Sequence, residues 1–430
     1  MLRTFYGSAE LSADWTGEYE EKSAQWFELF LDLIMVAACS NVAEGFKDDL
    51  TVAGFLEFIL LCLMYSSSWH LYTHFNARFS ETSLLHYSFL YLLLMGLGSM
   101  VLASEPGYRF TIGLVSIRIA MVLMNSSVIC SLPEARAKAR IDIALGVIAI
   151  TLFISALVID THTWTIAVYL LTLVLETLAA FVVARCFPGS FVAMNIDHVD
   201  EREGCMVMVA LGESVVSAFI NSRGADLPAH FYMATCLSLL VIFSLAIFYF
   251  ATKPPRAMHA MRRSVYSGFA YSLMHYALLP TLLATGVGTK LVSEAVLKAT
   301  PLSSNALWVL YGSISLALLE MLVIRLLHYW GRQPAPSDPI DVKRIKYAWW
   351  AICAVSPLCP LGIALIFEVA NPRGVAPISA LVGAAAVVLF WLVSETSVMH
   401  CLRVLGYGYS GTLEKKRDDP ETLLLPERTV

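Results

Sequence analysis

Glu213 carries the strongest chemical implication in this sequence. It lies inside an apolar run, residues 204–220, about nine residues from either end. If that run crosses a bilayer, its carboxyl group lies near the midplane, where a charge costs roughly 2.5–3.5 kcal/mol on insertion scales. An acid survives there when it is protonated, paired or facing a hydrated cavity, so Glu213 is the first candidate for ion or proton binding.

Two further acids open the first long apolar segment. Glu28 and Asp32 are four residues apart, which places both on one face of a helix. Acids at the start of a helix are also favoured by its N-terminal dipole. That explanation accounts for Glu28 better than for Asp32, because Asp32 lies past the first turn among apolar residues. We therefore add both to an intramembrane polar site.

The run that contains Glu213 is preceded by a charged segment with His198, Glu201 and Arg202. Arg202 and Glu213 are eleven residues apart, so they share a helix face at a separation of about 16 Å. We predict that this segment forms a cytoplasmic mouth. A metal site at His198 is the alternative, but a hydrated charge cluster is favoured because zinc needs tighter ligand spacing. No metal and no cofactor are predicted.

Three other polar residues lie inside apolar segments: Arg118, Glu176 and His275. Arg118 is about ten residues from either end of its segment, too deep to reach water, so it needs a carboxylate partner. Glu213 and Glu176 are at matching depth. The sharper hypothesis is an ion pair between Arg118 and Glu213, and whether that pair is functional or only fixes helix packing is left open.

The segments that position these residues are apolar windows of about 17–25 residues. Of the 430 residues, 58% are apolar and 15% are charged, which predicts an all-α polytopic transmembrane bundle. About twelve spans are expected, near 26–45, 52–72, 83–104, 108–130, 141–160, 163–186, 204–221, 229–251, 264–287, 303–330, 347–370 and 375–401. Pro280, Pro357 and Pro360 should kink or break their helices, and Arg325 near a span end should reach toward water.

The distribution of basic residues orients these spans. With twelve spans both termini lie on one side, and that side holds 21 of the 29 Lys and Arg residues against 6 on the other. Because cytoplasmic segments carry the excess of Lys and Arg, both termini are predicted to be cytoplasmic. The membrane is predicted to be the plasma membrane or an endomembrane such as the vacuole or endosome.

The chain divides into one membrane domain and two polar tails. Residues 1–25 are predicted as a cytoplasmic tail, 26–403 as the helical domain, and 404–430 as a cytoplasmic, disordered tail. The last tail holds Asp419-Pro-Glu-Thr-Leu-Leu, the pattern of an endosomal or vacuolar sorting signal. His-Tyr and Gly-x-Gly recur six spans apart, which suggests a 6+6 parallel repeat with halves 26–186 and 204–401.

Two of these motifs resemble the signatures of the low temperature requirement A (LtrA) family of polytopic membrane proteins. Trp26-Phe-Glu-Leu-Phe-Leu-Asp-Leu resembles its opening signature, and His198-Val-Asp-Glu-Arg leading to Leu211-Gly-Glu-Ser matches its second. The resemblance spans roughly residues 20–400. Departures are Glu203, where an aromatic is usual, and the end of the eighth span near Phe250, which lacks an expected acid. The resemblance implies the fold and the site residues and no established biochemical activity.

The leading hypothesis is a transporter or channel-like protein with a polar path around Glu213. The alternative is a membrane-embedded enzyme that acts on a lipophilic substrate, with Glu213 and Asp32 as general acids. A structural or sensory protein is the third reading. Expected partners are the lipid bilayer and a small ion, proton or lipophilic molecule. Nucleic acid is excluded, because the net charge of −5 is small and the basic residues are dispersed.

Overall fold

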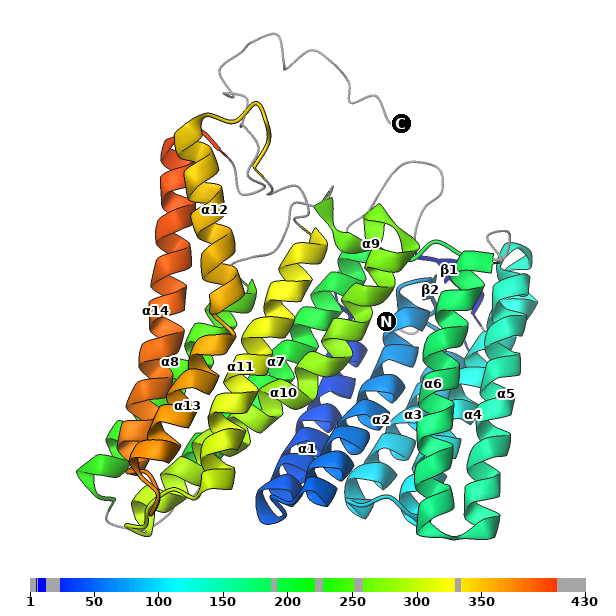
Figure 1. Cartoon of the computed structure of the whole chain (residues 1–430). Helices are drawn as coiled ribbons and strands as arrows, with labels where there is room; N and C mark the ends of the chain where they lie inside the picture. Colours follow the sequence, from blue (N-terminus) through cyan, green and yellow to red (C-terminus); the bar gives the residue numbers. More distant parts are fainter. Residues whose placement is uncertain are drawn as a thin grey trace.

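The fold is an all-α bundle of long helices (Figure 1). The computed structural model describes residues 5, 7–12, 24–186, 192–220, 227–250, 258–328 and 334–407. The tail at 408–430, with the sorting pattern that begins at Asp419, lies outside the described residues. The predicted fold class is confirmed.

The helices follow one another with short connections. They are α1 (Trp26–Asp48), α2 (Val52–Asn76), α3 (Leu84–Ala103), α4 (Tyr108–Ser131), the 3-10 turn η1 (Pro133–Ala135), α5 (Arg136–Ile159), α6 (His162–Cys186), α7 (Ile196–Ile220), α8 (Ala229–Phe250), α9 (Ala260–Arg263), α10 (Val265–Leu297), α11 (Ser304–His328), α12 (Ile340–Val355), α13 (Leu358–Ala370) and α14 (Pro377–Val404). The strands β1 (Glu10–Leu11) and β2 (Phe79–Ser80) form a two-stranded antiparallel ribbon.

Among the described residues, nine helices are long and apolar enough to cross a membrane, and the α12–α13 pair adds a tenth if it is one broken span. The predicted count of twelve is therefore not confirmed. The remaining long helices are α7, with 25 residues, and α10, with 33. Both exceed the roughly 30 Å of a bilayer core at 1.5 Å per residue, and both lie inside the bundle (Figure 1). We treat them as members of the membrane domain.

Of the three prolines predicted to kink or break helices, Pro360 lies in the first turn of α13, and the other two act differently. The chain breaks at Pro357, where α12 ends and α13 begins with a bend of 44°. Proline removes a backbone donor and clashes with the preceding turn, which accounts for the break. In contrast, α10 continues through Pro280 as one helix.

The segment before α1 is more than a polar tail. Glu10 and Leu11 pair with Ser80 and Phe79, just after α2. The Ser12 backbone N–H donates to the Arg78 carbonyl at 2.8 Å, which extends the pairing by one residue. The start of the chain therefore packs against the α2–α3 connection.

Helices α1, α2, α7 and α10 position the polar residues. In Figure 1, α3 to α6 lie on one side of these helices, and α8 and α12 to α14 lie on the other. The α7–α10 contact is unusually close, since a Cβ added at Gly286 would lie 2.3 Å from the Ser214 hydroxyl oxygen and 3.0 Å from its Cα. Glycine at this position permits the two backbones to approach.

Candidate functional site

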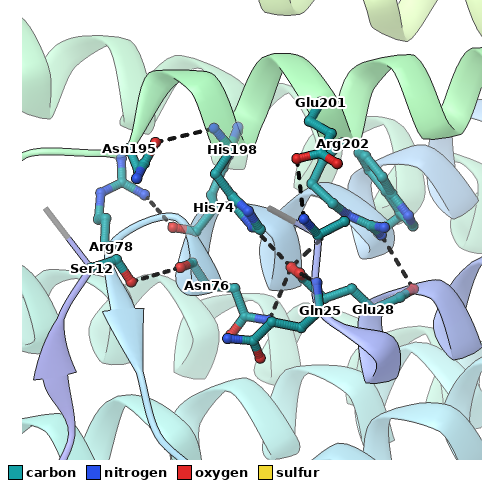
Figure 2. Close-up of polar contacts among 12 residues, drawn as sticks. Ser12, Gln25, Glu28, His74, Asn76, Arg78, Asn195, His198, Glu201 and Arg202 are labelled. Atoms are coloured by element: carbon teal, nitrogen blue, oxygen red, sulfur yellow. Dashed lines mark hydrogen bonds and ion pairs between the residues drawn. The ribbon is translucent and has the colours of Figure 1, made fainter. Parts of the chain in front are cut away.

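Two acids of α1 meet two basic residues of α7 inside the protein. The Glu28 carboxylate lies 3.0 Å from His198 Nε2, and Asp32 accepts two hydrogen bonds of 2.7 Å from the Arg202 guanidinium. Figure 2 shows His198 and Arg202 pointing from α7 toward Glu28. All four side chains are buried. We call these four residues the Glu28-side network, and the end of the bundle at which α1 begins the Glu28 side.

Neighbouring groups donate further hydrogen bonds to the two carboxylates of this network. Asn76 Nδ2 donates to Glu28 at 3.1 Å, and the Gln25 backbone N–H donates to its other oxygen at 2.9 Å. The indole N–H of Trp69 donates to Asp32 at 2.8 Å, and its ring lies 4.9 Å from the Arg202 guanidinium carbon. The two bonds from Arg202 to Asp32 are bidentate and charge-assisted, and bonds of this kind are strong and directional. The network therefore ties α1, α2 and α7 together.

The predicted mouth is thus only partly exposed. Glu201 is exposed and accepts a hydrogen bond from the Ala24 backbone N–H at 3.1 Å. His198 and Arg202 are instead fully buried, so a hydrated charge cluster is wrong for these two. The reason is that α1 packs over the α7 face that carries them and supplies their carboxylate partners.

Arg118 pairs with Glu176, and not with Glu213. Its Nε and Nη2 donate to the two carboxylate oxygens of Glu176 at 2.9 and 2.8 Å, and Ser67 and Ser68 accept further bonds. The hypothesis of an Arg118–Glu213 pair is therefore wrong. Arg118 lies on α4 and faces α2 and α6, whereas Glu213 lies on α7 and faces α1.

Glu213 itself is buried, with 4% of its surface exposed. Its carboxylate accepts a hydrogen bond from the Ser217 hydroxyl at 2.9 Å, and Ser40 of α1 also lies against it. In the part of the chain that the structure describes, no Lys, Arg or His nitrogen lies within 4.0 Å of it. Hydroxyl groups can donate to a carboxylate or accept from a carboxylic acid. The site therefore accommodates Glu213 in either protonation state.

A second charged network lies at the opposite end of α1. Glu44 pairs with Lys47 on its own helix and with Lys290 on α10, and Lys47 lies 3.2 Å from Glu294. We call these four residues the Glu44-side network, and this end of the bundle the Glu44 side. None of these four residues belongs to the site predicted from the sequence. The available signal was the helical spacing of Glu44 with Lys47 and of Lys290 with Glu294.

His275 is not close to Glu213. Its Nε2 lies 2.8 Å from the Tyr249 hydroxyl of α8, and its Nδ1 lies 2.9 Å from the Tyr271 carbonyl one turn earlier. The Tyr271 hydroxyl donates to Asp200 of α7 at 2.8 Å. His275 therefore belongs to a separate polar cluster between α7, α8 and α10.

Glu203, which departs from the family signature, has a partner on another helix. Its carboxylate lies 2.9 Å from His70 Nε2 of α2, and both side chains are buried. The His70 ring stacks on Tyr276 with centroids 4.1 Å apart. The sequence signals for this pair were a histidine within an apolar span and an acid at position 203, where the family signature has an aromatic.

Arg325 does not reach toward water as predicted. It is 2% exposed, pairs with Glu395 of α14 and donates to the Phe248 carbonyl at 2.6 Å. The partners of Arg325 are thus a backbone carbonyl near the end of α8 and a carboxylate from another helix. Within the described ranges, no group of three or more His, Cys, Asp or Glu residues is arranged to hold a metal ion.

The comparisons with known proteins agree with the sequence motifs. The family model described as bacterial low temperature requirement A protein (LtrA) matches residues 23–403. No curated protein and no solved structure matches the chain. The matched range covers both signature segments, which the structure joins through Glu28 with His198 and Asp32 with Arg202. The chain is a multi-pass membrane protein that belongs to the LtrA family.

Proposed function

We propose that this protein is a transporter for a proton or a small cation, with Glu213 as the group that binds it. The observation that supports the proposal most is the position of Glu213, a buried carboxyl group with hydroxyl partners that lies between two ion-paired networks. Hydroxyl groups and the more distant Lys290 offset the charge of a Glu213 carboxylate only in part. A buried charge is costly at this depth, so the site favours an arriving proton or cation.

The two networks are placed to act as gates. About 18 Å of helical rise separate Asp32 from Glu44 on α1. The Glu28-side network joins α1 to α7, and the Glu44-side network joins α1 to α10. Glu213 faces Ser40, which lies between Asp32 and Glu44 along α1. In this arrangement Glu213 is buried between the two networks, of which the Glu28-side one is buried and the Glu44-side one has a partly exposed carboxylate at Glu44.

Alternating access follows if the networks open one at a time. Separation of Lys290 from Glu44 would hydrate Glu213 from the Glu44 side. Separation of Arg202 from Asp32, with α1 moving off α7, would hydrate it from the Glu28 side. Each closed network stabilises α1 on its partner helix while the other opens, which is the coupling that a transporter requires.

The direct test is transport by purified full-length protein in liposomes. A trapped pH dye reports proton movement under an imposed pH gradient, and Na⁺ and K⁺ gradients are tested in parallel. Glu213→Gln should reduce the flux at least about tenfold because the amide cannot take up a proton, while leaving insertion and folding intact.

Glu320→Gln is the matched control. Glu320 on α11 is also buried, and its carboxylate likewise accepts from a hydroxyl, Thr281 Oγ1 at 3.1 Å. It lies on the α10–α11 face, away from α1, so its variant should retain flux within about twofold. The absence of flux in the unaltered protein, or equal flux in both variants, would overturn the proposal.

A further inference from the structure

A polar pocket lies in the half of the bundle that the proposed transport site does not use. It has a volume of about 150 Å³ and is enclosed by α2, α4, α5 and α6. Its polar lining comprises His74, Arg78, Arg118, Asn125, Lys138, Asp142 and Glu176. The remaining wall is apolar and includes Leu145 of α5 and small residues of α6 such as Ala179 and Ala180.

The charges of this pocket do not balance. Three basic residues, Arg78, Arg118 and Lys138, line it with two carboxylates, Asp142 and Glu176. Arg118 donates two hydrogen bonds to the carboxylate of Glu176, one to each oxygen, and Lys138 pairs with Asp142. The Arg78 guanidinium is the cation left over. Burial lowers the pKa of Arg78 from its ordinary value, and the nearby Asp142 carboxylate opposes this.

Several polar atoms of the lining lack a partner. Arg78 donates from Nη1 to the His74 carbonyl at 2.9 Å, but its Nε has no acceptor. His74 Nε2 and Asn125 Oδ1 also have no hydrogen-bond partner among the residues that the structure describes, and Asn125 is 4% exposed. Buried polar groups are normally satisfied, so three such atoms around one cavity mark it as a candidate site for a polar ligand.

We propose that this pocket binds a phosphate-bearing anion. Arg78 and Lys138 supply the charge that attracts a phosphate, and the Asn125 carbonyl is placed to accept from a hydroxyl or ammonium group on the same ligand. Basic pockets between membrane helices are suited to anionic headgroups, whose acyl chains would follow the apolar α5–α6 wall. Free phosphate offers the same chemistry without the chains.

The test measures thermal stabilisation of the purified full-length protein in neutral detergent. One arm adds phosphatidylglycerol, a second adds inorganic phosphate, and phosphatidylcholine and chloride serve as their references. A ligand that binds only the folded state raises the melting temperature as its concentration exceeds the dissociation constant. A shift with phosphatidylglycerol alone identifies a headgroup, and one with inorganic phosphate identifies the free anion. No shift in either arm overturns the proposal.

Variants assign the effect to the pocket. Lys138→Gln should weaken binding about tenfold or more, because it removes one of the two cations that face the ligand. Arg140→Gln is the matched control, since Arg140 lies two residues away on α5, is exposed and does not line the pocket. Equal weakening by both variants would place the effect outside the pocket and overturn the proposal.

Asp142→Asn tests the same site in the opposite direction. Removing the carboxylate that pairs with Lys138 should strengthen binding several-fold, since an unpaired ammonium group remains in the pocket. A variant that binds more tightly must be folded, so this result does not depend on the stability of Lys138→Gln. Weaker binding by Asp142→Asn, with the protein still folded, would contradict the assigned role of Lys138.

Discussion

The Asp32–Arg202 pair allows the sharpest test of how α1 is held to α7. Asp32→Asn keeps the size of the side chain and an oxygen that can accept from Trp69, but it removes the charge that faces Arg202. The Arg202 guanidinium is completely buried and donates two hydrogen bonds of 2.7 Å to this carboxylate. The substitution therefore removes the two short ionic bonds of a buried charge and leaves Arg202 only the longer contact of 3.9 Å to the Glu28 carboxylate and a bond of 3.4 Å to the Glu28 carbonyl.

The expected loss of stability is about 3–5 kcal/mol, the usual cost of removing one member of a buried pair. Arg202→Gln should cost a similar amount, because Asp32 is then left unpaired. The free energy of unfolding of the double variant, Asp32→Asn with Arg202→Gln, should be clearly higher than the value obtained by adding the losses of the two single variants. We expect an interaction energy of about 2–3 kcal/mol, since two buried groups without charge replace an isolated charge.

The assay is unfolding of the purified protein in mixed micelles by titration with sodium dodecyl sulfate, followed by tryptophan fluorescence. All four members of the cycle are compared under the same conditions. If Asp32→Asn is as stable as the unaltered protein, or if the two losses simply add, then the pair does not hold α1 to α7 and the proposed Glu28-side gate has no energetic basis.

Two further predictions concern packing and pH. Gly286→Ala should destabilise the protein by about 1–3 kcal/mol because the new Cβ overlaps Ser214. Gly98→Ala is the control and should be tolerated, because no described atom outside its own turn lies within 4 Å of the added Cβ. Equal thermal stability of the two variants would show that α7 and α10 can move apart freely. Burial raises the pKa of Asp338, but hydrogen bonds from Lys346 Nζ at 2.7 Å and from a backbone N–H outweigh this and hold the pKa below its ordinary value of 3.8. A lowered pKa stabilises the fold above the unfolded value, and this contribution is lost as pH falls below about 4. The protection of the amides before α12 against hydrogen exchange, measured relative to their intrinsic rates, should therefore fall there in the unaltered protein and not in Asp338→Asn.

The sequence predicts the helices well because each helix depends on its own residues. Apolar length and proline positions located the long helices of the described residues and the break at Pro357, although α7 begins at Ile196 and not near 204, and α10 ends at Leu297 and not near 287. Polar residues that share a helix face were also found, as with Glu28 and Asp32. These inferences need only helical geometry and the cost of burying charge.

Partners on different helices were harder to predict. Depth left both Glu176 and Glu213 as candidates for Arg118, and only the packing of α4 against α2 and α6 decides between them. Arg325 was expected to reach water, because it lies near the end of its predicted span. Its position in the sequence does not reveal that Glu395 of α14 lies beside it. Matching depth limits the candidates, but helix adjacency selects the pair.

The ribbon of β1 and β2 fixes a relation between distant parts of the chain. Glu10 and Ser80 lie side by side, and two long helices, α1 and α2, come between them in the sequence. A chain that returns to its starting face has crossed the membrane an even number of times. Whichever compartment receives the start of the chain, the turn after α2 occupies the same one, and the pocket residue Arg78 is adjacent to that shared face.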